Sequence, residues 1–227
     1  MKKNLVVLTG AGISAESGIS TFRDANGLWE NHDIMEVASL DGYHRNPELV
    51  QEFYNQRRRQ LHEVEPNAAH YFLKQLEENF NTVIITQNVD DLHERANSTN
   101  IIHLHGELRK ARSEKNENII VDCYKEIKIG DLASDGNQLR PHIVWFGEMV
   151  PMIEKAIDEV VKADIILIVG TSMQVYPAAS LKDYAKLNVP IIYIDPSETS
   201  DSSLIHIQKK ATDCLVELQS ILNNLNS

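Results

Sequence analysis

The feature that most constrains the fold is a glycine-rich turn that directly follows a short apolar run. Residues 5–9 are Leu-Val-Val-Leu-Thr, and Gly10-Ala11-Gly12-Ile13-Ser14-Ala15 comes next. A strand that ends in Gly-x-Gly-x-x-Ala and turns into a helix is typical of parallel α/β sheets, where glycines let the backbone approach a pyrophosphate. The pattern by itself also fits a turn that only packs a helix on a strand. We therefore expect an α/β fold, with a dinucleotide site as one interpretation.

The second half of a dehydrogenase fingerprint is missing. In that class another strand ends in Asp or Glu about 20 residues after the turn, and this carboxylate binds the adenosine ribose. Here the corresponding residues 27–33 predict a loop. The sequence thus indicates a dinucleotide held in a different way from that of a hydride-transfer enzyme.

Composition narrows the class of protein. The chain has 227 residues, 42% of them hydrophobic, and a net charge of −11. This length suits one domain, and the negative charge disfavours nucleic acid as a partner. No apolar run is long enough to cross a membrane, and the first strand starts too early for a signal peptide. Cys123 and Cys214 lack metal-ligand spacing, so we expect free thiols in a cytoplasmic protein.

The rest of the chain predicts a doubly wound parallel, Rossmann-like sheet. Continuous runs rich in β-branched residues indicate strands covered on both faces. These runs are residues 4–9, 82–86, 101–104, 143–146, 165–169 and 191–195. Helices are predicted at 47–61 after the cap Asn46, at 67–79, 152–161 and 177–187, and after the cap Thr212, with Leu215, Leu218, Ile221, Leu222 and Leu225 on one face.

Two polar insertions delay this pattern and predict a small second lobe. We expect one domain over residues 1–227, in which the Rossmann-like core takes about 1–25, 62–106 and 141–227. The small lobe would take about 26–61 and 107–140, and a cleft between the two parts would lie over the strand ends.

Polar side chains follow four of the predicted strands. They include Gln87, Asn88 and Asp90 after one strand and His105 after the next, with residues 170–172 and 195–197 after two more. Each could simply cap the following helix. Because all four ends meet at one edge of a parallel sheet, beside the glycine turn, a site is the favoured interpretation. His105 is the candidate general base, since an imidazole titrates near neutral pH.

Five motifs together resemble the sirtuin family, in order and over nearly the whole chain. They are residues 10–29, Thr86-Gln87-Asn88-Val89-Asp90, His103-Leu104-His105-Gly106-Glu107-Leu108, Pro141-His142-Ile143-Val144-Trp145-Phe146-Gly147-Glu148 and Gly170-Thr171-Ser172. The resemblance implies an NAD-consuming protein lysine deacylase, which releases nicotinamide and transfers the acyl group to ADP-ribose. It implies acyl-lysine proteins as substrates, with no nucleic acid or membrane partner.

The resemblance also implies a role for each matched residue. His105 would act as base on a ribose hydroxyl, and Asn88 would orient the ribose or a water. The cofactor-binding set would be Gly10, Ala11, Gly12, Ser14, Glu16, Phe22, Arg23, Trp29, Gln87, Asn88, Asp90, Gly170, Thr171, Ser172, Asp195, Pro196, Ser197 and Ala211. Val144, Phe146, Gly147 and Glu148 would flank the acyl-lysine, whose backbone adds as a strand.

The helix at 47–61 carries a further signal. Tyr54 and Arg57 share its apolar face, whereas Arg58 and Arg59 are expected to lie off that face. An inward guanidinium needs an anion, so Arg57 pairs with an acid of the small lobe, extends outward, or binds a ligand. Tyr-x-x-Arg also resembles the motif of sirtuins that remove succinyl and malonyl groups. In that interpretation both residues grip the distal carboxylate, beside a roomy pocket at Ala38.

One departure from the family concerns zinc. Most sirtuins carry two Cys-x-x-Cys pairs before the Pro-His motif, but this interval holds only Cys123. Tetrahedral zinc needs four ligands, so we expect no metal site. The small lobe would then be held by apolar packing of Ile119, Ile120, Val121, Tyr124 and Ile127.

Two other functions stay open at this level. An NAD hydrolase or ADP-ribosyltransferase could use the same pocket, and a nucleotide sensor could bind without turnover. Tyr54 and Arg57 favour a deacylase with some deacetylase activity and a preference for acidic acyl groups. The set Asn88, Asp90 and His105 disfavours a sensor.

Overall fold

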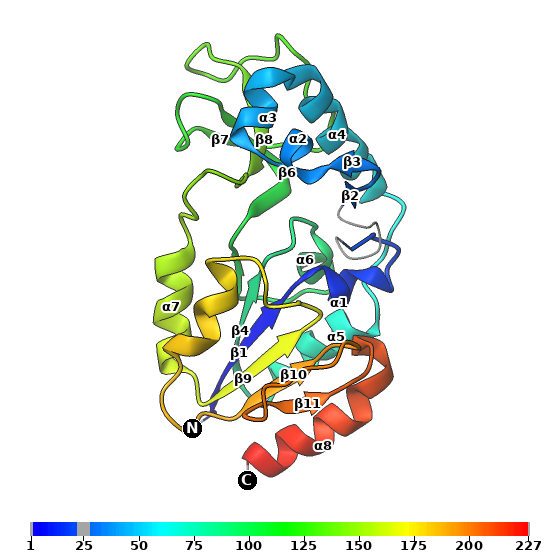
Figure 1. Cartoon of the computed structure of the whole chain (residues 1–227), viewed down its shortest axis with the longest axis vertical. Helices are drawn as coiled ribbons and strands as arrows, with labels where there is room; N and C mark the ends of the chain where they lie inside the picture. The colour runs from blue at the N-terminus through cyan, green and yellow to red at the C-terminus, as the bar shows by residue number, and fades with distance from the viewer. Residues whose placement is uncertain (1, 22–27, 227) are drawn as a thin grey trace.

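Six parallel strands form the main sheet of the protein. The computed structural model describes residues 2–21 and 28–226, and the strand order is β11-β10-β9-β1-β4-β5 (Figure 1). The strands are β1 Asn4–Thr9, β4 Asn81–Thr86, β5 Ile101–His103, β9 Ile165–Val169, β10 Ile191–Ile194 and β11 Ile205–Ile207. Thr9 lies in register with Thr86 on one side and Val169 on the other. The loops after β1, β4 and β9 therefore meet at one edge of the sheet.

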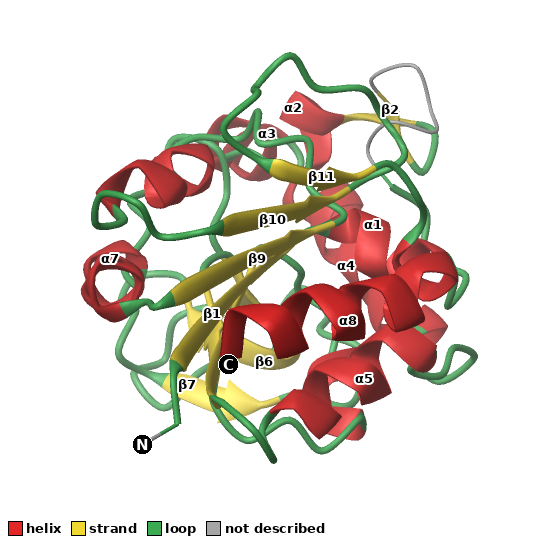
Figure 2. Ribbon diagram, turned by 90° about the horizontal axis from the view of Figure 1, so that it is seen from below, coloured by secondary structure: helices red, strands yellow, loops and turns green. Residues whose placement is uncertain are grey.

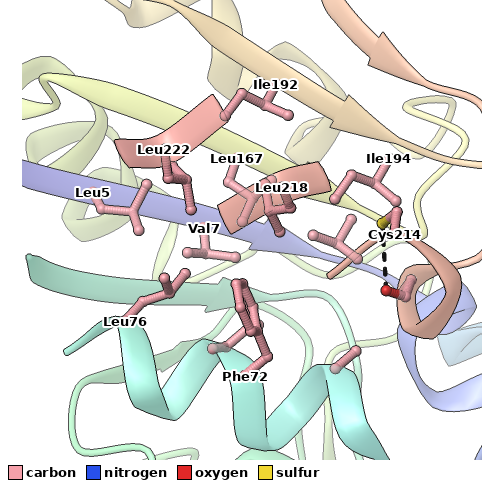
Figure 3. Packing of buried hydrophobic residues seen from close by; sticks show 14 of the residues in the cluster. Leu5, Val7, Phe72, Leu76, Leu167, Ile192, Ile194, Cys214, Leu218 and Leu222 are labelled. Carbon is pink, nitrogen blue, oxygen red and sulfur yellow. Dashed lines mark hydrogen bonds between the residues drawn. The ribbon is translucent and has the colours of Figure 1, made fainter. Parts of the chain in front are cut away.

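Helices cover both faces of this sheet, as expected for continuous apolar strands. On one face lie α5 (Ala68–Leu76) and α8 (Leu215–Asn226), and on the other lie α7 (Ile153–Lys162) and the 3-10 helix η1 (Ala178–Tyr184) (Figure 2). Figure 3 shows Leu218 and Leu222 of α8 packed over Val7 and Leu167 of the sheet. The face predicted for the last helix is confirmed: Leu218 and Leu222 are buried, and its three other apolar residues pack beside them.

A separate antiparallel sheet lies beyond the carboxyl ends of the main strands (Figure 1). Its order is β7-β6-β8. Its strands are β6 Gly106–Ser113, β7 Ile120–Asp122 and β8 Leu139–Ile143. A short hairpin lies nearby and consists of β2 Leu28–Trp29 and β3 His32–Asp33. The helices of this part are α2 Ile34–Val37, α3 Leu40–Arg45 and α4 Pro47–Gln60. The expected start of α4 is confirmed, because the Asn46 side chain accepts from the Leu49 N–H and Pro47 is the first helical residue. These elements share one apolar core that includes Tyr43, Phe53 and Trp145.

The expected apolar island at residues 119–127 contributes little to the core of this small lobe. Ile120 and Val121 are each 43% exposed and Tyr124 is 63% exposed, so the predicted packing is wrong for these three residues. Only Ile127 of the predicted set is buried in the core, and its N–H donates to Asn55 on α4. Ile120 and Val121 lie on β7, which forms one edge of the small sheet beside β6, and Tyr124 follows that strand.

The principal buried cluster joins Arg112 on β6, Arg140 on β8 and Glu148. Arg140 Nη1 donates to Glu148 Oε1 at 2.7 Å, and Arg112 Nη2 donates to the same oxygen at 2.9 Å. The Glu148 Oε2 atom accepts from Arg140 Nη2 and from the Trp145 N–H. This cluster ties β6 and β8 of the small sheet to the segment after β8.

Several predicted elements differ from the structure. Residues 143–146 are not a strand of the parallel sheet: Ile143 ends β8, which pairs with β6 in the small sheet. The helix predicted at 177–187 is the shorter 3-10 helix η1. Thr212 does not cap α8, because it lies in the 3-10 helix η2 (Ala211–Cys214) and its hydroxyl donates to Glu16. β11 was missed, since three residues carry too little pattern to predict a strand.

No helix among the described residues is long and apolar enough to cross a membrane.

Candidate active site

The glycine turn lies at the point where the strand order changes direction. The helix α1 (Ala11–Ala15) follows β1, and its loop packs directly on the loop after β9. The N–H of Gly12 donates to the Gly170 carbonyl at 2.8 Å. A Cβ at Gly12 would come within 2.6 Å of Gly170 Cα, and Gly170 itself has φ +63°, so both positions require glycine. Among the described residues no side chain caps α1, so the backbone at its start can be approached closely.

Three predicted site residues form one buried hydrogen-bond network behind this turn. Asn88 Nδ2 donates to the Gly10 carbonyl and to Ser14 Oγ, each at 3.1 Å. Ser14 Oγ donates to Asp90 Oδ2 at 2.9 Å. The loop after β4 is thereby fixed to the start of α1, and the amide and carboxylate lie side by side.

Burial changes the ionisation of Asp90. This carboxyl is only 6% exposed, and desolvation raises its pKa to about 6. The hydrogen bonds from the Leu92 N–H and from Ser14 oppose the shift without cancelling it. A carboxyl poised near neutral pH beside a dinucleotide turn is the kind of group that functional sites carry.

His105 is held as a neutral base. It follows β5, and its Nδ1 lies 3.1 Å from the Gln87 carbonyl oxygen. A carbonyl can only accept, so Nδ1 carries the proton and Nε2 keeps its lone pair. Burial lowers the pKa of His105, although the Gln87 carbonyl opposes this shift. The imidazole is therefore unprotonated at neutral pH, as a general base must be.

His103, two residues earlier, has its pKa shifted in the opposite direction. Its Nε2 lies 2.6 Å from Glu94 Oε1, and its Nδ1 lies 3.3 Å from the Asn88 carbonyl. Burial alone would lower its pKa, but the hydrogen bond to Glu94 and the charges of Glu94 and Glu107 outweigh burial and raise it. Acceptors at both nitrogens favour the protonated form of His103, whereas Nε2 of His105 has no partner among the described residues.

The remaining predicted cofactor residues line the neighbouring strand ends. Gln87 Nε2 donates to Thr171 Oγ1 at 3.1 Å and so links the loops after β4 and β9. After β10, the buried Asp195 accepts from the Ser197 N–H. Pro196 is exposed, Ser172 is half-buried, and the buried Ala211 begins η2 beside Thr212. Glu16, at the end of α1, accepts hydrogen bonds from the main-chain N–H and the hydroxyl of Thr212. Phe22 and Arg23 lie outside the described residues.

Tyr54 and Arg57 lie together on α4, away from the phosphate turn. Tyr54 is fully buried, and its hydroxyl accepts from Trp145 Nε1 at 3.0 Å. The Arg57 guanidinium stacks 4.7 Å from the Phe53 ring, and its buried Nε and Nη1 have no hydrogen-bond partner within the described ranges. Burial lowers the pKa of Arg57, and the charge of Glu30 only partly opposes this. Trp29, predicted on the cofactor side, packs edge-on against Phe53 and lies near Tyr54.

The expectation for Arg58 is wrong. This side chain is 1% exposed, with Nε bonded to the Leu108 carbonyl and Nη1 bonded to Asn55. Helix α4 buries a second face against β6, which periodicity within the helix did not reveal. Arg59 is exposed as expected, at 46%, and pairs with Glu52 and Glu126.

The segment 144–148 joins the two ends of the site. The Val144 N–H donates to the His105 carbonyl, and the Phe146 N–H donates to the Ala38 carbonyl. Phe146 and Gly147 are exposed, whereas the Glu148 carboxylate is held by Arg112 and Arg140. The sequence analysis did not assign Trp145, Arg140 or Arg112. Only Trp145 lay within a quoted motif.

Among residues 2–21 and 28–226, no three His, Cys, Asp or Glu side chains come together as a metal site.

Fold and site together define a parallel α/β protein with a dinucleotide-type turn at its switch point and a neutral histidine beside it. The chain belongs to the Sir2 (sirtuin) family, whose model matches residues 10–177. A Helicobacter pylori (strain ATCC 700392 / 26695) protein named NAD-dependent protein deacylase is 55% identical, over 96% of this chain and 100% of its own length. A Bacteroides thetaiotaomicron protein of the same name is 54% identical, over 97% and 98%.

Solved structures agree with this assignment. A mutant Sir2 homologue in complex with ADP-ribose is 41% identical with a TM-score of 0.88, and the match covers 98% of this chain and 93% of that one. A Sir2 homologue in complex with NAD is 41% identical with a TM-score of 0.87, covering 100% and 91%. These matches confirm the predicted α/β fold class and the resemblance to sirtuins.

Proposed function

We propose that the protein is an NAD-dependent protein lysine deacylase that prefers acidic acyl groups such as succinyl and malonyl. Membership of the Sir2 family and the names of its relatives support the deacylase activity. The observation that carries the acyl preference is the pair of Arg57 donors, next to Tyr54, for which the described part of the chain supplies no partner. The free thiols of Cys123 and Cys214 fit the cytoplasmic location that we propose.

The strand ends would hold NAD. The glycines of the turn at Gly10–Gly12 and of the loop at Gly170–Ser172 would let the phosphates approach the backbone closely, and Asp90 can accept from the carboxamide of nicotinamide. NAD supplies a ribose carbon that accepts the acyl oxygen when nicotinamide leaves. The chain's own contribution is His105, whose free Nε2 can take a proton from a ribose hydroxyl.

The acyl-lysine would enter beside the segment 144–148. Phe146 and Gly147 are exposed there, while the backbone of Val144 and Phe146 is fixed by His105 and Ala38. A fixed, partly exposed segment suits a peptide that adds as a strand. A solved Sir2 mutant in complex with a p53 peptide and NAD, 28% identical to this chain with a TM-score of 0.78, gives a relative that binds a peptide.

The acyl preference follows from the cost of leaving a buried guanidinium unpaired. Two buried donors of Arg57 find no partner among the residues that the structure describes, and such a group favours any anion that reaches it. An acetyl group has no charge to offer. A succinyl or malonyl group ends in a carboxylate, which matches the planar fork of arginine.

Matched acetyl- and succinyl-lysine peptides with NAD, followed by mass spectrometry, test this function. Wild type should remove succinyl faster. Arg57→Met should reduce desuccinylation kcat/KM roughly 10- to 100-fold, the range expected for hydrogen bonds to a charged group, and change deacetylation about twofold or less. Arg59→Met is the matched control, because Arg59 is exposed and already paired. Equal losses on both peptides contradict the carboxylate role, and ADP-ribose formed without any change in the peptides indicates an NAD hydrolase.

A further inference from the structure

Trp145 makes a single directed contact with the proposed acyl site. Its indole Nε1 lies 3.0 Å from the Tyr54 hydroxyl oxygen. Both side chains are buried, Tyr54 at 0% and Trp145 at 2% exposure. The bond connects the segment after β8 to α4, over a sequence distance of 91 residues.

The chemistry of the two groups fixes the direction of this bond. An indole N–H can only donate, so the Tyr54 oxygen must accept. The phenol then still has its own proton to donate, and no acceptor for that proton is found within the described part of the chain. Burial raises the pKa of Tyr54, so the proton stays on the oxygen at neutral pH. Within residues 2–21 and 28–226, Tyr54 and Arg57 thus both present donors that have no acceptor.

The indole is fixed from its other sides. The Arg140 guanidinium carbon lies 3.4 Å from the ring centroid, and the Tyr43 ring lies 4.8 Å away. The Trp145 main-chain N–H donates to Glu148, which also holds Arg140. Because the buried ion cluster sets the plane of the indole, its N–H points at Tyr54 before any substrate is present.

We infer that Trp145 is a positioning residue for acidic acyl groups, which holds Tyr54 as an acceptor and directs the phenol proton to the distal carboxylate of the substrate. The inference rests on the proposed function. Without the indole N–H, the hydroxyl of Tyr54 could rotate and lose its preset direction, at a cost to carboxylate binding. An acetyl group has no distal carboxylate, so its removal would not depend on this contact.

The test uses Trp145→Phe, Tyr54→Phe and the double variant, assayed with the same acetyl and succinyl peptides. Trp145→Phe removes the N–H and keeps a ring under Arg140. We expect it to lower desuccinylation kcat/KM roughly five- to tenfold, with deacetylation within about twofold. In the Tyr54→Phe background, Trp145→Phe should cause no further selective loss, because the hydroxyl that it positions is absent.

Equal losses on both peptides, or the same selective loss in the Tyr54→Phe background, overturn the inference. If Trp145→Phe does not fold, replacement of Trp145 by benzothienylalanine decides the matter, since sulfur there replaces only the N–H. Arg57→Met separates the two proposals: a selective loss for Arg57→Met with none for Trp145→Phe overturns this inference alone. A non-selective Arg57→Met removes the proposed acyl preference itself.

Discussion

Asp90 gives the sharpest link between stability and function in this protein. Burial raises its pKa from 3.8 to about 6. This rise in pKa corresponds to about 3 kcal/mol of stability that the folded state loses when Asp90 ionises. The folded state binds this proton more tightly than the unfolded chain does. The stability is therefore complete below pH 3.8 and is lost as the pH rises through about 6.

Asp90→Asn removes the charge and keeps the shape. Its oxygen can still accept from the Leu92 N–H, and Ser14 can turn its hydroxyl to accept from the new amide. We expect the free energy of unfolding in urea, measured without NAD, to exceed that of wild type by about 3 kcal/mol at pH 8 and by about half as much at pH 5. NAD should raise the melting temperature less in the variant, because the carboxylate acceptor is gone.

The difference in free energy of unfolding between variant and wild type isolates the contribution of Asp90 from that of other groups that titrate in this pH range. Asp164→Asn is the matched control, since Asp164 is exposed at the opposite end of the sheet and accepts from the Asn4 N–H. A variant less stable than wild type at pH 8, or a stability difference that is the same at both pH values, would refute the reasoning.

Three further predictions follow from the same contacts. His105→Ala should lower deacylation kcat roughly 10²- to 10⁴-fold, with the fold intact by circular dichroism. The kcat/KM of wild type should stay constant above about pH 6.5, because burial lowers the pKa of His105. A decline of kcat/KM that begins well above pH 6.5 as the pH falls would contradict this. Glu148→Gln should lower the free energy of unfolding by about 3–5 kcal/mol, since it removes the carboxylate charge that pairs with Arg140 and Arg112. A loss below 1 kcal/mol in urea would show that the cluster is not structural. Burial lowers the pKa of His70 to about 4, so the unfolded chain binds this proton at a higher pH than the folded state does. His70→Gln should therefore reduce the loss of stability that occurs as the pH falls from about 6.5 to 4. An unchanged slope of melting temperature against pH would count against this prediction.

Local sequence predicted most of the main sheet. Five of its six strands lie where continuous β-branched runs placed them, because burial on both faces leaves a signal within a few residues. The polar strand ends were also predicted, and Ser14, Asn88 and Asp90 do share one network. The segment 143–146 misled the prediction, because an apolar run looks the same whether it pairs in a parallel or an antiparallel sheet.

The small lobe shows what local sequence could not give. Arg57 and Arg58 are neighbours, yet Arg58 Nε donates to Leu108, on β6, whereas Arg57 Nε has no partner in residues 2–21 and 28–226. Which arginine faces which partner depends on the strand packed against each side of α4. The sequence also did not predict that Arg112 and Arg140 pair with Glu148, the glutamate of the Pro-His motif.

The sequence by itself determined the order of the motifs, the strands of the core and the helical face shared by Tyr54 and Arg57, because these depend on residues a few positions apart. Only the tertiary structure decided that the Gln87 carbonyl sets the tautomer of His105. The tertiary structure likewise placed the indole of Trp145 on the Tyr54 hydroxyl. Both contacts join segments that are distant in the chain, and the donors and acceptors they bring together are set by packing rather than by spacing.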